Sequence, residues 1–197
     1  MVAQVVTEFD PTDITEASIQ FKTSSGTYDP GKPFGCVGSL SGEGENFTIE
    51  KKCGQRTMKS KTKTSKLNMT LSGHIPLAVA RDIFGLTNKD LKPGIWAAGT
   101  LTKGKDFILT VTAVDEFEDN KKLMAFPNSS NTAGFKIQPL ESGVEEVAML
   151  EIQFSSLADE LNFFYYEAIV AELEDPTIET KWHTAFNREL VEVVPGP

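Results

Sequence analysis

Two histidines and two cysteines are the residues of this 197-residue chain that most often bind metals or act as catalytic bases and nucleophiles. They are His74, His183, Cys36 and Cys53, and no two of them lie within a few residues of each other. Zinc sites take their ligands in pairs at short spacing, so this pattern predicts no metal site. We expect both histidines to be surface or capping residues, and both cysteines to be reduced and partly buried.

Carboxylates offer a second route to chemistry, because two of them brought together can act as a general acid and a general base. The adjacent pairs Glu145-Glu146 and Asp159-Glu160 are candidates, but both lie in turn-like surroundings where solvated surface charge is the usual state. The string GSLSG at residues 38–42 resembles a nucleophile elbow with a leucine in place of the central serine. Neither common glycine-rich phosphate loop occurs. The sequence therefore predicts no enzyme, no catalytic residue and no cofactor.

The run from Lys51 to Lys66 has the charge needed to bind a polyanion. It contains seven basic residues and no acidic one, and it could neutralise several phosphates of a nucleic acid. It lacks the interleaved aromatic residues on which proteins that bind single strands stack the bases. The net charge of −9 and the pI near 4.8 also argue against a general affinity for nucleic acid or for an anionic membrane. Nucleic-acid binding through Lys51–Lys66 is the alternative function.

Positive and negative charges are separated along the sequence. Between Glu141 and Glu192, thirteen acidic residues stand against two basic ones, so a cationic segment precedes an anionic C-terminal part. Opposite potentials on two patches steer identical copies into head-to-tail contact. We therefore expect an interface between copies, and its candidate residues lie in the cationic segment: Arg56, Lys59, Lys61, Lys63 and Lys66.

The segment from about residue 47 to residue 72 has the pattern of a projecting β-hairpin arm with its tip near Gly54. Lysines at every second position from 59 to 63 share one strand face, since side chains alternate along a strand. Neither face of residues 57–66 is apolar, so this part should project or lie on another surface instead of entering its own core. The other interpretation is a solvated edge strand whose lysines deter aggregation.

A short helix is expected at about residues 76–84, flanking the sheet. The apolar residues Ile75, Val79 and Ile83 recur every four positions, which gives the helix one apolar face. Pro76 suits the first helical position, and Gly85 suits a left-handed C-terminal cap. Because only one face is apolar, this helix must lie on a sheet.

Much of the remaining chain alternates apolar and polar residues, which is typical of β-strands. We expect a hairpin of strands 95–101 and 106–114, a loop at 127–131, and strands at 134–140, 144–154, 162–173 and 189–194, with a helix as the alternative at 162–173. The sequence thus predicts a mainly β fold in one domain over residues 1–197, with a flexible C-terminal end from about 176 to 197. No apolar run approaches the roughly 18 residues that span a bilayer, and the N-terminus lacks the features of a secretory signal.

The order of elements from Lys66 to Leu86 resembles that of the major tail proteins, or tail tube proteins, of long-tailed bacteriophages. An amphipathic strand (KLNMTLSG), a short helix (PLAVARDIFGL) and later β-hairpins carry the resemblance, which covers most of the chain in layout but not the part after Asp175. It implies a β-sandwich or barrel with a flanking helix, and hexameric rings stacked into a hollow tube that DNA traverses without specific binding. The arm, roughly Phe47 to Ser72, would reach over a neighbouring subunit or ring.

The resemblance also implies a location in the virion, after synthesis in the cytoplasm of a bacterial host. The implied partners are copies of the same chain and the tail tip (initiator), tape measure and tail terminator proteins, with no membrane among them. The functional hypothesis is a self-assembling structural subunit of a phage tail tube that conducts DNA into the host.

Overall fold

The computed structural model describes residues 5–117, 119–140, 142–143, 145 and 147–193. The elements follow one another as β1 (Asp13–Phe21), β2 (Lys32–Pro33), β3 (Cys36–Cys53), β4 (Arg56–His74), α1 (Leu77–Phe84), β5 (Phe107–Asp115), β6 (Asn120–Asn131), β7 (Leu150–Leu157), β8 (Tyr166–Ile169), the 3-10 helix η1 (Val170–Glu172), α2 (Thr177–Trp182) and α3 (Arg188–Val191).

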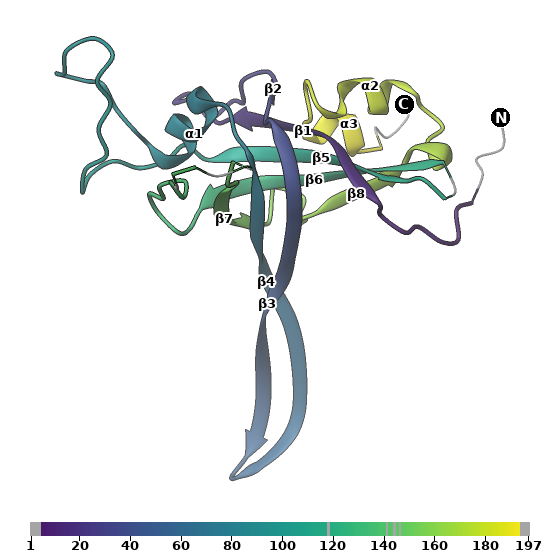
Figure 1. The fold of residues 1–197 in the computed structure, drawn as a ribbon. Coiled ribbons are helices and arrows are strands. Elements are labelled where there is room, and N and C mark those ends of the chain that lie inside the picture. Colours follow the sequence, from purple (N-terminus) through teal and green to yellow (C-terminus); the bar gives the residue numbers. More distant parts are fainter. Residues whose placement is uncertain (1–4, 118, 141, 144, 146, 194–197) are drawn as a thin grey trace.

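The eight strands formed by the described residues belong to one antiparallel sheet (Figure 1). Seven follow the order β2-β1-β5-β6-β7-β4-β3, and β8 pairs with β6 outside that path. β6 changes its partner along its length, because residues 122–125 pair with β8 and residues 129–131 pair with β7. The sheet curls, so that residues of β1, β3, β4 and β6 line one pocket. The prediction of a mainly β fold with a long hairpin and a flanking helix is confirmed.

The main hydrophobic core lies between the curled sheet and α1. Ile19 and Phe21 of β1, Leu71 of β4 and Phe154 of β7 are all fully buried there. The rings of Phe107 and Phe154 lie with their centroids 5.7 Å apart. The alternating apolar residues of non-adjacent strands therefore meet in one continuous cluster, which is the main source of stability for a domain of this size.

Helix α1 covers the end of this core where β5 begins. Val79, Ile83 and Phe84 are its buried residues, which lie on one face of the helix. Gly85 takes a left-handed conformation with φ 69°, and its N–H donates to the carbonyl oxygen of Arg81. The predicted helix and its glycine cap are confirmed, with Pro76 at the N-cap and not at the first helical position.

A second, smaller core lies on the opposite face of β5 and β6. Ile108 and Leu123 contribute to it from the strands, and Trp182 and Phe186 contribute from the C-terminal segment. The two aromatic rings of that segment meet edge to face with centroids 4.8 Å apart. Figure 1 shows α2 and α3 lying over the sheet. β5 is therefore buried on both faces.

The sequence misassigned the strand that pairs with β5. Residues 95–101 form no strand and belong to an exposed loop, whose base is a bridge between Thr87 and Ala97. β5 pairs instead with β1 and β6, so the predicted hairpin of 95–101 with 106–114 is wrong. Residues 127–131, expected as a loop, are the end of β6, and residues 134–140 form no strand.

Assignments in the last third of the chain were partly right. The strand expected at 144–154 is found at Leu150–Leu157, and within 162–173 only Tyr166–Ile169 form a strand. The strand expected at 189–194 is wrong, because α3 occupies residues 189–191 and the other described residues of that range, 192 and 193, form no strand. No helix among the described residues has the length and apolar character needed to cross a membrane.

Candidate subunit interface

The hairpin of β3 and β4 projects from the body as a long arm (Figure 1). The two strands pair along their whole length, from Cys36 opposite His74 to Cys53 opposite Arg56. Only residues 66–73 of β4 also pair with β7. From residue 46 to residue 64 the hairpin pairs only with itself, and we call this projecting part the arm.

The two ends of the arm are defined by local backbone features. At the tip, Gly54 has φ 61°, as the first central position of a two-residue type II′ turn requires. At the root, the register shifts between Glu45 and Asn46, which leaves Ser65 unpaired in a β-bulge. The hydroxyl of Ser65 donates to the carbonyl oxygen of Glu45 at 3.0 Å. Bulges bend a strand, so this one lies where the arm leaves the body.

The two faces of the arm differ in chemistry. The lysine face carries Lys59, Lys61 and Lys63, which lie opposite Lys51, Ile49 and Phe47 respectively. The hydroxyl face carries paired polar residues: the hydroxyls of Thr48 and Thr62 lie 3.0 Å apart, and Thr64 donates to Asn46 at 2.7 Å.

Sequence reasoning on residues 57–66 missed an apolar element of the lysine face. The side chains of Phe47 and Ile49 are 46% and 53% exposed, between the lysines of the facing strand. Both side chains would leave water only if another surface covered the lysine face. Reading the register of the two strands together would have placed them on the lysine face.

The structure brings four of the five predicted interface residues onto the arm and places the fifth at its root. Among the described residues, Arg56, Lys59, Lys61 and Lys63 make no ion pair. Lys66 instead pairs with Glu45 at 3.2 Å. Hydrogen bonding to Asn68 and Lys66 lowers the pKa of the Glu45 carboxyl. Lys66 therefore serves its own subunit, and the other four cations are free to meet an external partner.

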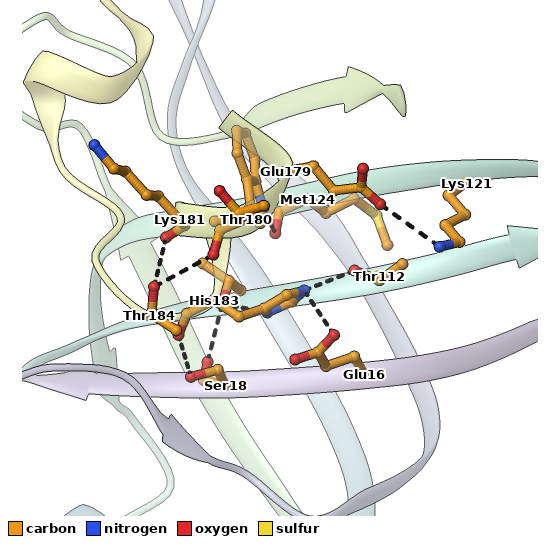
Figure 2. A network of polar contacts seen from close by, with 12 residues as sticks. Glu16, Ser18, Thr112, Lys121, Met124, Glu179, Thr180, Lys181, His183 and Thr184 are labelled. Atoms are coloured by element: carbon orange, nitrogen blue, oxygen red, sulfur yellow. Dashed lines mark hydrogen bonds and ion pairs between the residues drawn. The ribbon is translucent and has the colours of Figure 1, made fainter. Parts of the chain in front are cut away.

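The histidine of the C-terminal segment corrects the sequence-based expectation of a surface residue. His183 is only 8% exposed, and its Nε2 atom lies 2.6 Å from the hydroxyl of Thr112 (Figure 2). Its Nδ1 atom lies 2.9 Å from the hydroxyl of Thr110. Nε2 is also 3.9 Å from the Glu16 carboxylate. Burial lowers the pKa of His183, while Glu16 opposes this shift. Both threonines are also buried, so the imidazole lies inside the fold and joins the C-terminal segment to β5.

Side chains of β1 hold the backbone that surrounds this histidine. The hydroxyl of Ser18 donates to the carbonyl oxygen of His183 at 2.7 Å, as Figure 2 shows. Gln20 donates to the carbonyl oxygen of Phe186 and accepts from its N–H at 2.9 Å. The C-terminal segment is thus fixed to the sheet by polar contacts as well as by Trp182.

The remaining chemical candidates occupy structural or solvated positions. Cys36 and Cys53 are free thiols as expected, but both are exposed and not partly buried. Asp159 accepts from the N–H groups of Leu161 and Phe163 and so holds a turn. Glu145 is exposed, and residue 146 lies outside the described residues. Within the described part of the chain, no three metal-binding side chains come together.

A solved structure of low sequence identity resembles the chain in its overall layout. That structure is described as the cryo-EM structure of the anti-feeding prophage cap, the tube terminating cap; the match covers 85% of this chain and 97% of that one, at 15% identity and a TM-score of 0.44. This likeness is too distant to assign a function. No protein-family model and no curated protein matches the sequence.

Proposed function

We propose that this chain is a structural subunit of a phage tail tube, whose copies form hexameric rings that stack into a hollow tube conducting DNA into the host. The observation that carries the proposal is the arm, formed by strands of 18 and 19 residues whose outer part pairs only with itself. The resemblance of the strand and helix at residues 66–86 supports the same assignment.

An arm of this kind needs a partner outside its own subunit. A two-stranded hairpin without a third strand is at best marginally stable in water. Both outer edges of the arm present unpaired backbone N–H and C=O groups, which are templates for pairing with another chain. The exposed Phe47 and Ile49 would gain further stability by leaving water.

A second copy of the same chain supplies a suitable partner. The lysine face is cationic, whereas residues 141–192 contain thirteen acidic residues and two basic ones. A contact between different patches on identical copies is heterologous, so it either closes into a ring or continues without limit. In a tube built of stacked rings, the contacts within a ring close, and the contacts between rings continue along the tube.

The overall acidity fits a conduit for DNA. A chain with a net charge of −9 repels phosphate, so DNA would traverse the tube without binding to its wall. Tail tip (initiator), tape measure and tail terminator proteins would meet the ends or the interior of such a tube. The virion is the corresponding location.

The test reverses the charge of Lys59, Lys61 and Lys63 to glutamate. We expect the body to keep its melting temperature, because these exposed side chains support no core contact, and we expect rings and tubes in negative-stain micrographs to disappear. Unchanged tubes would refute the electrostatic contact. Salt-dependent retention of DNA by wild-type monomers would instead support nucleic-acid binding through Lys51–Lys66.

A control variant places negative charge on the other face of the same arm. Glutamates at the hydroxyl-face positions leave the lysines intact and should weaken assembly much less; the positions are Ser60, Thr62 and Thr64. Equal loss of tubes in both variants would show that the charge of the arm matters but that its lysine face does not.

A further inference from the structure

A second segment projects from the body at the end where α1 lies. Residues 87–101 are all exposed, and Figure 1 shows this teal loop extending away from α1. The loop is nevertheless held at its base, because Thr87 and Ala97 exchange two backbone hydrogen bonds of 3.0 and 2.9 Å. Connections of this length without regular structure are uncommon in compact domains and usually have a function.

The loop presents exposed apolar side chains beside a hydrogen-bonded backbone turn. Leu101 is 96% exposed and lies in a turn. The backbone N–H of Thr102 donates to the carbonyl oxygen of Gly99 at 3.1 Å, and the Thr102 hydroxyl also bonds to the backbone of Gly99. Trp96 lies under the Arg81 guanidinium, 4.4 Å from it, and keeps part of its ring in contact with solvent. A loop held at its base that exposes leucine and tryptophan is suited to insertion into an apolar pocket.

The opposite end of the main core has such a pocket. α1 closes the core where β5 begins, but near the end of β5 a pocket of about 500 Å³ opens between Ile14, Leu67, Met124 and Tyr165. These four residues belong to the main core and are only partly buried. The core is thus covered at one end and open at the other.

We propose that the loop of residues 87–101 in one copy inserts its apolar side chains into the core opening of a second copy, which is a contact distinct from that of the arm. This inference rests on the proposed self-assembly and adds a second interface to it. Charges at the two sites are complementary: Lys89 and Lys92 outnumber Asp90 in the loop, whereas Glu8, Asp10 and Glu43 are exposed at or beside the opening. Lys103, just after the loop, lies 4.0 Å from Asp106 of its own subunit. The cation at the opening, Lys122, is engaged by Glu167 at 3.7 Å.

Placement of the loop and the opening at opposite ends of β5 makes the contact directional. Each copy offers one loop and one opening, so successive copies line up along the strands of the sheet. The arm projects crosswise to β5 and β6 (Figure 1). Two contacts in two directions are what a ring that also stacks requires.

Engineered disulfides test the contact. In a background with Cys36→Ser and Cys53→Ser, a chain carrying both Thr100→Cys and Ser41→Cys places one thiol beside Leu101 and one at the rim of the opening. Mild oxidation of the assembled protein should produce a ladder of dimers, trimers and longer chains on non-reducing gels. Pairing Thr100→Cys with Ser25→Cys, near the α1 end of the sheet, should produce no ladder.

A second variant tests the apolar part of the contact. Leu101→Asp in the double-cysteine chain should reduce the ladder at least about tenfold, because a leucine-sized side chain then no longer leaves water. Leu77→Asp makes the same change at another exposed leucine at this end and should leave the ladder intact.

The outcomes separate this inference from the proposed function. Tubes without a ladder overturn the loop contact and leave the tube function standing. A ladder without rings or tubes supports the loop contact and overturns the tube function, and the absence of both overturns both. A ladder that survives Leu101→Asp overturns the insertion of the loop into the opening.

Discussion

Acidification should destabilise the protein through the buried imidazole of His183. Its pKa is lowered in the folded state by burial, and both ring nitrogens are occupied by neutral hydroxyls. In the unfolded chain the group titrates near its ordinary value of about 6.5. Between the two pKa values the unfolded chain therefore binds a proton that the folded chain does not. The stabilising contribution is present above about pH 6.5 and is lost as the pH falls toward the folded-state pKa.

The pH dependence of the unfolding free energy has an upper limit, because a single group, His183, is responsible for it. A single differential proton changes the free energy of unfolding by at most about 1.4 kcal/mol per pH unit. Glu16 is 3.9 Å away but its side chain is 63% exposed, so it offsets only part of the cost of charging the imidazole. Carboxyl groups with lowered pKa values, such as Glu45 and Glu151, add no slope in this range, because any stabilisation that they provide is complete above their unfolded-state pKa and is lost only at more acidic pH.

Urea unfolding of dilute protein between pH 7.5 and pH 5.5 measures this slope. His183→Asn should be destabilised at neutral pH by about 1–3 kcal/mol, because a buried threonine hydroxyl loses its partner, and it should lose the slope. His74→Asn, at an exposed histidine, should keep both stability and slope. Parallel pH profiles for the wild type and His183→Asn would refute the reasoning. A larger free energy of unfolding at pH 5.5 than at pH 7.5 would show that Glu16 keeps the imidazole protonated.

Two further variants test the core and the arm. Trp182→Ala should cost about 3–5 kcal/mol in urea unfolding, because the side chain is 1% exposed and bonds the Met124 carbonyl oxygen. Trp96→Ala, at the partly exposed tryptophan, should cost clearly less, and equal losses would contradict this assignment of the second core. Replacing residues 46–64 by a two-residue Asn-Gly turn should change the unfolding free energy of the body by no more than about 1 kcal/mol. The same change should abolish tubes in micrographs; tubes built without the arm would contradict its role.

Features written into short stretches of sequence could be predicted. The helix at α1 has apolar residues at every fourth position and a glycine placed for its cap, and both signals act within about ten residues. The arm could be predicted because residues 57–66, in which lysines alternate with hydroxyl side chains, have no apolar face. In each case the local pattern and the tertiary position agree.

Features decided by distant partners could not be predicted in the same way. Alternation marks residues 95–101 as a strand, but the edges of β5 are taken by β1 and β6, and the loop is left outside. His183 stands in a polar stretch, and only the packing of Trp182 places it against β5. One signal was overlooked: Asn187 accepts from the N–H of Leu190, a helix cap that its position before Arg188 could have indicated.

The regular spacing of Lys59, Lys61 and Lys63 also opposes pairing between the arms of two molecules. Free strand edges invite the arms of two molecules to pair with each other, which would trap subunits as unproductive dimers. Such pairing would bring rows of ammonium groups together, and like charges on facing strands oppose it. A subunit can therefore keep two open edges at high concentration and still reserve them for a differently charged surface. Repulsion between arms therefore favours contact of the arm with an acidic surface over contact with another arm.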